Sequence, residues 1–333
     1  MRSTFLYAVW ILMGILYLQR LFRRGRRFLK IAVEEDVTIA LAHWPARGSA
    51  VLCLHGLTAN HKCWVALARL LQKAGYDVYA PDLRGRGQSS RPKRAYGSEV
   101  HVADCVRIMS AIGHERFHVV AHSFGCSIAL ELAARYPQRV RSLVLMDGGG
   151  VLNIRQKFRV LRMLGPSFDR LLKTYPNADA YLQQIRTSPM IDAWSGQIEE
   201  HFRYELEECP GGVRCNIPPG VIETEMAAMG GSVLPARIFR RALNAPARFW
   251  KTLRRNNRPP YTKVPQPVLV LVAGKANLIP GDQLLPENAV RRMRSELPDC
   301  RSLYFPELNH YGILIAEDNR RDEAILKFLH DRA

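Results

Sequence analysis

An alternation of short apolar runs with segments of helical period constrains the fold of this chain most strongly. The apolar runs have the composition of buried parallel strands and occupy residues 51–56, 77–83, 117–123, 142–148, 267–274 and 301–307. Between them, apolar residues recur at helical spacing around residues 63–75, 101–113, 127–137 and 287–298, with a closing segment at 321–332. This alternation predicts an α/β fold whose mostly parallel sheet is covered by helices on both faces.

One long interval, from about Val151 to Tyr261, breaks the alternation. It contains helix-like stretches and a basic segment but no clear strand, so we expect a mostly helical cap over the carboxyl ends of the strands. A chain of 333 residues is long enough for one core with such an insertion. The expected division is an N-terminal segment at 1–30, the first part of the core at 31–150, the cap at 151–262 and the second part of the core at 263–333.

The N-terminus carries an uncharged apolar run from Ser3 to Gln19, which would cover roughly 25 Å as a helix. The positive charges cluster after this run, with a single arginine, Arg2, before it, and no small-residue cleavage site is present. We therefore expect an uncleaved single-pass membrane anchor, with an interfacial helix and an atypical signal peptide as alternatives. The basic flank places the folded body in the cytoplasm, against the anionic leaflet. Its residues are Arg20, Arg23, Arg24, Arg26, Arg27 and Lys30.

The formal net charge of +18 is the unusual bulk property of the chain. Its cations gather in the N-terminal flank and in a second group between residues 237 and 258. No RNA-binding signature, helix-turn-helix pattern or zinc-finger spacing accompanies them. Nucleic acid is therefore not an expected partner, and lipid headgroups are the better candidate. The oligomeric state does not follow from the sequence.

The seven cysteines are odd in number, scattered and mostly inside apolar runs. This pattern is typical of reduced thiols in a cytosolic compartment. A local bridge between Cys209 and Cys215 is the alternative. None of the cysteines pairs with histidines at a metal-ligand spacing, so we expect no metal.

The segment VVAHSFGCSIALELA places Ser123 between a buried strand and a helix. Small residues stand two positions before and after the serine, at Ala121 and Gly125. A sharp strand-to-helix turn requires them, because a larger side chain there would strike the neighbouring backbone. Such a turn holds the Ser123 hydroxyl clear of the sheet, whereas a serine that only caps the helix is the alternative.

Two further strand ends carry groups that suit acyl transfer, since ligands of such sheets lie at the carboxyl ends of the strands. In LCLHGLTANHKCW, His55 and Gly56 precede a loop, and we assign two oxyanion donors to the backbone N–H groups of Leu57 and Phe124. His55 itself is expected to organise this loop. In YFPELNHYG, His310 follows the last strand, where a general base can reach Ser123.

These motifs resemble those of the α/β-hydrolase superfamily of esterases and lipases. The resemblance covers residue 50 to the C-terminus, in the order HG, D-x-R-G-x-G-x-S from Asp82 to Ser89, A-H-S-F-G, a cap and a late histidine. It implies an α/β-hydrolase fold with Ser123 as nucleophile and no metal or organic cofactor. In such enzymes the loop from Asp82 to Ser89 is more often structural than catalytic.

The chain departs from the most familiar pattern at the position of the triad acid. That arrangement has an aspartate three residues after Gly274, where this chain has Asn277. An amide cannot stabilise the imidazolium that forms when His310 takes the serine proton. Some branches of the superfamily carry the acid after the preceding strand, in an LVLVDGG-like motif that LVLMDGGG resembles. Asp147 is therefore the expected acid, with Asp282 and a site without an acid as alternatives.

The expected function is that of a membrane-anchored serine hydrolase that cleaves a carboxylic ester through an acyl-enzyme on Ser123. The anchor and the basic charge favour a lipophilic small-molecule substrate, such as a lipid-derived ester. A carbon–carbon bond hydrolase or a lyase on the same triad is an alternative. So is a non-catalytic binding protein on the same fold.

Overall fold

The computed structural model describes residues 26–192, 194–228, 243–247, 251 and 259–332. The anchor predicted at residues 3–19 and most of the basic segment at 235–255 lie outside these ranges. Among the described helices, none is both long and apolar enough to cross a membrane.

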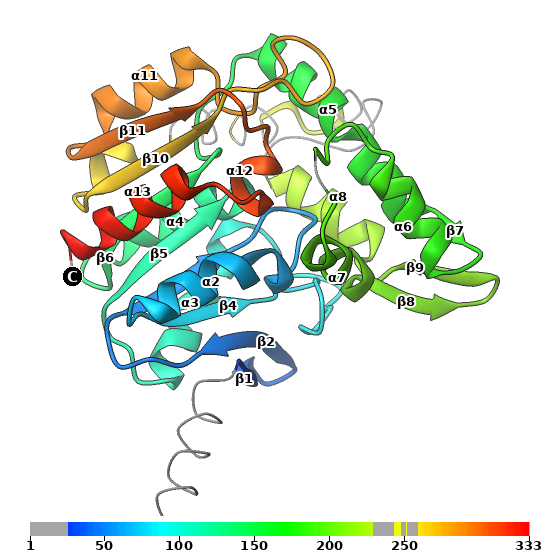
Figure 1. Ribbon diagram of the computed structural model, residues 1–333, viewed down its shortest axis with the longest axis horizontal. Coiled ribbons are helices and arrows are strands. Elements are labelled where there is room, and N and C mark those ends of the chain that lie inside the picture. The colour runs from blue at the N-terminus through cyan, green and yellow to red at the C-terminus, as the bar shows by residue number, and fades with distance from the viewer. Residues whose placement is uncertain (1–25, 193, 229–242, 248–250, 252–258, 333) are drawn as a thin grey trace, which may run out of the picture.

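An eight-stranded sheet forms the centre of the molecule, in the order β1-β2-β4-β3-β5-β6-β10-β11 (Figure 1). The strands from β4 to β11 run parallel, whereas β1 and β2 form a hairpin whose second strand pairs antiparallel with β4. The mostly parallel sheet predicted from the sequence is confirmed. The strands are β1 (Arg27–Glu34), β2 (Val37–Trp44), β3 (Ala50–Leu54), β4 (Asp77–Pro81), β5 (Phe117–His122), β6 (Val140–Met146), β10 (Val268–Ala273) and β11 (Cys300–Phe305).

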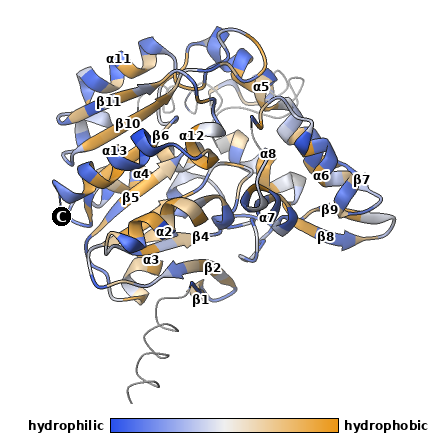
Figure 2. Cartoon of the chain, viewed as in Figure 1, coloured by the Kyte–Doolittle hydropathy of each residue, from blue (hydrophilic) through white to orange (hydrophobic). Residues whose placement is uncertain are grey.

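Helices cover both faces of the sheet, which is why its central strands are apolar at nearly every position (Figure 2). Alternate residues of β3 enter different cores: Leu52 belongs to the cluster that includes α3 and α4, and Cys53 to the cluster that includes α2 and α13. The helices of the core are α2 (Val65–Lys73), α3 (Ser98–Ala111), α4 (Phe124–Arg135), α11 (Glu287–Glu296), α12 (Gly312–Ile315) and α13 (Asn319–His330), with 3₁₀ turns η1 (His61–Trp64) and η2 (Tyr261–Lys263).

The described part of the chain between β6 and β10 leaves the sheet and forms the cap, on the right of Figure 1. Besides helices it contains a three-stranded antiparallel sheet in the order β7-β9-β8, which the sequence pattern did not predict. Its strands have only two to four residues, and a Pro-Gly-Gly turn with positive φ at Gly211 and Gly212 joins two of them. The elements are α5 (Ile154–Leu172), β7 (Thr174–Tyr175), α6 (Ala178–Arg186), α7 (Gly196–Tyr204), β8 (Leu206–Cys209), β9 (Gly212–Cys215) and α8 (Pro219–Ala228).

All seven cysteines are free thiols, so Cys209 and Cys215 on the cap hairpin are not bridged. Burial raises the pKa of the Cys215 thiol to about 12, which keeps it protonated at neutral pH. The cysteines therefore contribute to packing and form no cross-link.

Candidate active site

Ser123 lies at the turn between β5 and α4, in a backbone conformation with φ 55° and ψ −117°. A non-glycine residue with positive φ is strained and requires close support from its surroundings. That support comes from neighbouring backbone: a Cβ at Gly125 would lie 2.2 Å from the Leu54 carbonyl oxygen, and one at Gly148 would lie 2.4 Å from the Ser123 carbonyl oxygen. The small residue predicted two positions after the serine is thus required by a neighbouring strand.

Asp147 follows β6 and turns its carboxylate toward His310. The His310 Nδ1 and Asp147 Oδ2 atoms are 2.7 Å apart, and both side chains are buried. The other carboxylate oxygen accepts a hydrogen bond of 3.2 Å from the Ala273 backbone N–H. The backbone of Asp147 also has positive φ, 47°, and its N–H donates to the Leu271 carbonyl at 2.8 Å. Two hydrogen bonds to β10, one to the carboxylate and one from the backbone N–H, therefore hold Asp147 in place.

The backbone of His310 is held on both sides. Its N–H donates to the Asn277 Oδ1 atom at 3.0 Å, and its carbonyl accepts from the His122 Nε2 atom at 2.9 Å. Because the Nδ1 atom of His310 donates to Asp147, its Nε2 atom is left as the acceptor. His310 and Ser123 line the same cavity, which is the arrangement required of a base and its nucleophile.

Asp282, the alternative acid, does not contact His310. Its carboxylate accepts hydrogen bonds from the backbone N–H groups of Asn277 (2.8 Å), Leu278 (2.7 Å) and Ile279 (2.9 Å). The side chain is fully buried and stabilises the conformation of the loop that follows β10. The role of Asn277 was missed from the sequence: it is the acceptor that anchors the histidine backbone.

The loop after β3 places Leu57 in the lining of the cavity that also contains Ser123. The Gly56 carbonyl accepts from His55 Nδ1 at 2.7 Å and from the Ala59 N–H at 3.3 Å. In a trans peptide the Leu57 N–H must point away from that carbonyl. Leu57 and Phe124 line the cavity beside Ser123, and the Phe124 N–H belongs to the first turn of α4, where N–H groups lack helical partners.

His55 is the residue that orients this peptide. Its Nε2 atom accepts from the Leu83 N–H at 2.9 Å, so its proton lies on Nδ1 and is donated to Gly56. Burial lowers the pKa of His55 to about 3, which keeps the ring neutral at physiological pH. A neutral ring with both nitrogens occupied organises the loop, as the sequence predicted, and is not available as a base.

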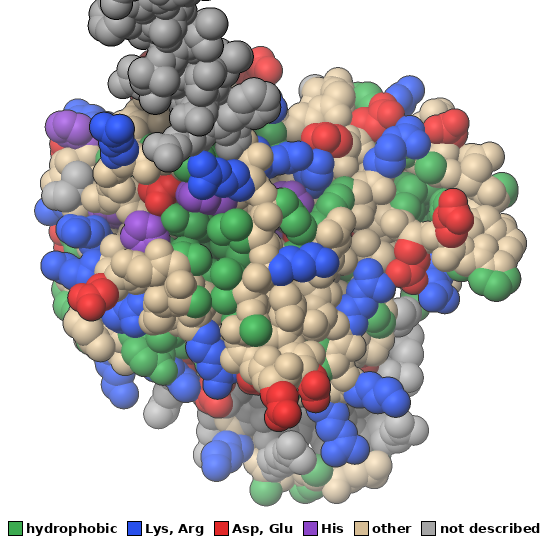
Figure 3. Space-filling model, turned by 90° about the horizontal axis from the view of Figure 1, so that it is seen from below, with side chains coloured by type: hydrophobic (Ala, Val, Ile, Leu, Met, Phe, Trp, Pro, Cys, Tyr) green, Lys and Arg blue, Asp and Glu red, His purple; other side chains and the backbone are tan. Residues whose placement is uncertain are grey.

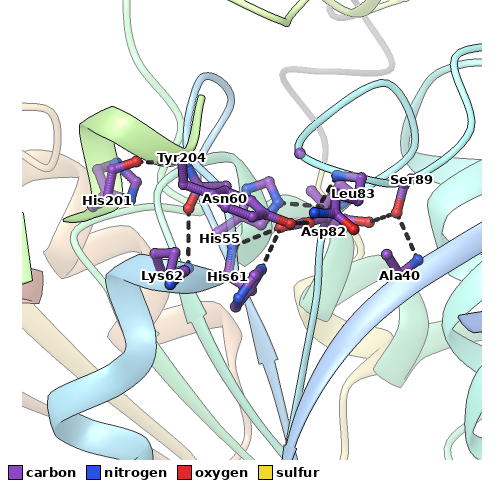
Figure 4. Close-up of polar contacts among 12 residues, drawn as sticks. Ala40, His55, Asn60, His61, Lys62, Asp82, Leu83, Ser89, His201 and Tyr204 are labelled. Carbon is purple, nitrogen blue, oxygen red and sulfur yellow. Dashed lines mark hydrogen bonds and ion pairs between the residues drawn. The ribbon is translucent and has the colours of Figure 1, made fainter. Parts of the chain in front are cut away.

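The loop from Asp82 to Ser89 connects the core to the cap (Figure 4). The Asp82 carboxylate accepts from the His61 N–H at 2.8 Å, from His61 Nδ1 at 2.9 Å and from the Tyr204 hydroxyl of α7 at 2.7 Å. The Ser89 hydroxyl donates to the Asp82 carbonyl and accepts from the Ala40 N–H. Burial raises the pKa of Asp82, but the His61 contacts outweigh this and hold the pKa below its usual value. These contacts are structural and do not reach Ser123.

A cavity of about 340 Å³ opens beside Ser123, between the strand ends and the cap. Among the described residues Lys157 is its one lysine or arginine, and burial lowers the pKa of that amine. His201 also lines it, and burial lowers its pKa to about 4, so its ring is neutral. The apolar lining residues include Leu57, Phe158, Val160, Leu161, Leu164, Phe168, Phe202, Met226, Leu284, Leu314 and Ile315. Such a lining suits an apolar ligand of modest size.

The described part of the chain brings together no group of three or more histidine, cysteine or acidic side chains that could hold a metal ion. The residues gathered at the cavity are a serine, a histidine whose Nδ1 atom contacts a carboxylate, and two backbone segments, at Leu57 and Phe124, that can offer N–H donors.

Comparison with known proteins gives the same fold. The 2-hydroxymuconate semialdehyde hydrolase of Pseudomonas sp. (strain CF600) is 37% identical over 130 residues, or 38% of this chain and 44% of that protein. The chain spans less than half the length of the curated relatives it matches.

Two solved structures share the architecture at low sequence identity. E-2-(acetamidomethylene)succinate hydrolase is 18% identical, with a TM-score of 0.69 over 92% of this chain and 99% of that one. A bacterial membrane phospholipase A is 22% identical, with a TM-score of 0.63 over 99% of both chains. A family model for the alpha/beta hydrolase fold matches residues 49–315. The chain therefore belongs to the α/β-hydrolase family.

Proposed function

We propose that this protein is a serine hydrolase that cleaves a carboxylic ester through an acyl-enzyme on Ser123. The observation that carries the proposal is the 2.7 Å hydrogen bond from His310 to Asp147, beside a serine on a strained turn. His310 takes the Ser123 proton through Nε2 as the serine oxygen attacks the ester carbonyl. Asp147 holds the required tautomer and stabilises the imidazolium that forms.

The remaining steps follow from the same groups. The backbone N–H groups of Leu57 and Phe124 stabilise the negative oxygen of the tetrahedral intermediate. His310 returns its proton to the leaving alcohol, and the ester bond breaks to leave the acyl group on Ser123. Water then attacks the acyl-enzyme, giving up a proton to His310, and the carboxylic acid leaves as the Ser123 hydroxyl re-forms.

The lining of the cavity supports a lipophilic small-molecule ester as the substrate. The side chains of α5 that face it are mostly apolar, and the cavity lies at the lower end of the size range of ligand pockets. The structural likeness to a bacterial membrane phospholipase A agrees with a lipid-derived ester as the substrate. We expect kcat/KM to rise with acyl-chain length until the cavity is filled.

A carbon–carbon bond hydrolase is the second candidate, because one relative is a 2-hydroxymuconate semialdehyde hydrolase. The test compares a chain-length series of p-nitrophenyl esters with 2-hydroxymuconate semialdehyde, in wild type and Ser123→Ala. We expect ester turnover that Ser123→Ala abolishes, and no turnover of the semialdehyde. Turnover of the semialdehyde alone would establish the second candidate, and activity retained in Ser123→Ala would contradict both.

We further propose that residues 3–19 anchor the protein in a membrane as a single span, with the hydrolase body on the cytoplasmic side. The support is the basic flank, whose described residues Arg26, Arg27 and Lys30 are exposed at the edge of the sheet. Lysine and arginine side chains also spread over the face shown in Figure 3, around a patch of hydrophobic side chains. Nucleic acid is not a proposed partner.

Carbonate extraction tests the anchor. The full chain should stay in the membrane pellet, and a variant that begins at residue 26 should be released. Protease added outside sealed cells should leave the hydrolase body intact. Release of the full chain by carbonate would contradict a transmembrane span, and cleavage of the body from outside would contradict the orientation.

A further inference from the structure

Two buried arginines hold the loop that carries an oxyanion donor. This oxyanion loop comprises residues 56–59. The Nε atom of Arg86 donates to the Leu57 carbonyl at 3.1 Å, and the Nη2 atom of Arg170 donates to the Thr58 carbonyl at 3.0 Å. With His55 on the Gly56 carbonyl, three successive carbonyls of the loop each have a donor. Because peptide units are planar, the Gly56 carbonyl fixes the Leu57 N–H, and the two arginines fix the next two peptide planes, which hold Leu57 from its other side.

Each arginine is paired with a glutamate of the cap. Arg86 Nη1 donates to Glu225 Oε1 of α8 at 2.8 Å. Arg170 of α5 donates to both oxygens of Glu205, which follows α7, at 3.0 and 3.1 Å. All four side chains are at most 4% exposed. Removing one partner of such a buried pair leaves an uncompensated charge, so each arginine depends on its glutamate for its position.

Arg86 also contacts Phe124, whose backbone N–H is the second proposed oxyanion donor. Its guanidinium lies over the Phe124 ring, 5.9 Å from the centroid. His101 meets the same ring edge-on at 5.7 Å, and its Nε2 atom is 2.5 Å from Glu225 Oε1. Burial raises the pKa of Glu225, but the His101 hydrogen bond and the Arg86 charge outweigh it and bring the pKa to about 2. Glu225 is therefore a carboxylate at neutral pH. It binds both Arg86 and His101, the two side chains that contact the Phe124 ring.

We propose that Arg86 and Arg170 are positioning residues for the oxyanion hole, and that their geometry depends on the position of the cap. The cap supplies Glu225 to Arg86, and it supplies Arg170 itself together with its partner Glu205. The cap thereby acts on the rate of acyl transfer as well as on substrate binding. This inference rests on the proposed serine hydrolase function. The four side chains act on the reacting atoms indirectly, through the carbonyls of the oxyanion loop and the ring of Phe124.

The test replaces each cap glutamate by glutamine, with Glu207→Gln as the matched control. Glu207 also joins the cap to the core, through a partly exposed 2.8 Å ion pair with Arg91, but it does not contact the oxyanion loop. For Glu225→Gln and Glu205→Gln we expect kcat on a carboxylic ester to fall about 10- to 100-fold, less than the effect of losing one donor outright. KM should change by less than about threefold, and Glu207→Gln should match wild type.

A pair of inhibitors distinguishes a loss of oxyanion-hole geometry from a general loss of structure. A trifluoromethyl ketone forms a tetrahedral adduct with Ser123 whose oxygen occupies the oxyanion hole, whereas the corresponding secondary alcohol binds without one. Glu225→Gln should weaken the ketone by the same factor as kcat and leave the alcohol unchanged. Equal weakening of both inhibitors, or an unchanged kcat in both glutamate variants, would overturn the inference.

The same measurements distinguish failure of this inference from failure of the proposed serine hydrolase function. If wild type neither hydrolyses esters nor forms the ketone adduct at Ser123, the proposed function fails. If wild type does both and the glutamate variants behave like Glu207→Gln, only the inference fails. Should Glu225→Gln not fold, as judged by near-ultraviolet circular dichroism, Glu205→Gln and the charge-preserving Glu225→Asp provide the same comparison.

Discussion

The loops after β6 and β10 both bury an aspartate, but the two carboxylates have different partners. The strands are neighbours in the sheet, so both loops lie at the same edge. Asp147 directs one oxygen to the imidazole of His310 and the other to a backbone N–H. Asp282 accepts from three backbone N–H groups of its own loop. The hydrogen-bond partners of a buried aspartate therefore determine its role. Its carboxylate can orient a catalytic histidine or stabilise the conformation of its own loop.

The two loops nevertheless cooperate on one residue. The loop after β6 contacts the His310 ring through Asp147, and the loop after β10 contacts its backbone through Asn277. Asn277 is itself held by Asp282, whose carboxylate accepts from its N–H. The position where the familiar arrangement has an acid thus anchors the histidine and cannot charge-balance it.

The largest expected effect comes from moving the carboxylate between the loops. We predict that Asp147→Asn combined with Asn277→Asp stays about 10⁴-fold below wild type in kcat, as Asp147→Asn alone does. The physical reason is that a carboxylate at 277 faces the backbone N–H of His310, not its Nδ1 atom. Ester hydrolysis measures the result, and recovery of activity in the double variant would show that the two loops are interchangeable.

The second-largest effect is expected for Asp282→Asn, and it concerns the free energy of unfolding. Asp282→Asn leaves one acceptor oxygen for three backbone N–H groups, so we predict a loss of about 1–3 kcal/mol in the free energy of unfolding. The value of kcat should fall by less than about tenfold, since Asp147 keeps its contact with His310. Urea unfolding and ester turnover provide the two numbers. A loss of kcat comparable to that of Asp147→Asn would place Asp282 in the triad.

The smallest effect on turnover is expected at a second aspartate–histidine pair, Asp82 and His61, which lies away from Ser123. The folded pKa of Asp82 is below its unfolded value, so its contribution to stability is full above about pH 4 and is lost as the pH falls through the folded pKa. The stability difference between wild type and Asp82→Asn should therefore shrink on acidification below about pH 4. A difference that grows instead would contradict the His61 contact as its source.

The sequence predicted much of the sheet because parallel strands buried on both faces leave continuous apolar runs. It also predicted the turn at Ser123, since a tight approach of backbone leaves small residues at fixed positions. The small sheet of the cap was missed because its short strands carry little periodic signal, although the turn at Gly211 and Gly212 was visible.

The glutamate partners of the buried arginines could not be predicted, because they join residues far apart in the sequence. Arg86 and Glu225 are 139 positions apart, and Arg170 and Glu205 are 35 apart. The sequence favoured Asp147 over Asp282 as the triad acid through the resemblance of LVLMDGGG to a family motif. Only the folded positions of the two loops show that one carboxylate meets an imidazole and the other meets backbone N–H groups.

The most direct test of this account is the rate of fluorophosphonate labelling at Ser123 in four proteins: wild type, Ser123→Ala, Asp147→Asn and Asp282→Asn. We predict rapid labelling of wild type, none of Ser123→Ala, a rate at least about 10³-fold lower in Asp147→Asn, and a rate within about tenfold of wild type in Asp282→Asn. Labelling of Asp147→Asn at the wild-type rate would contradict the assignment of Asp147 to the triad.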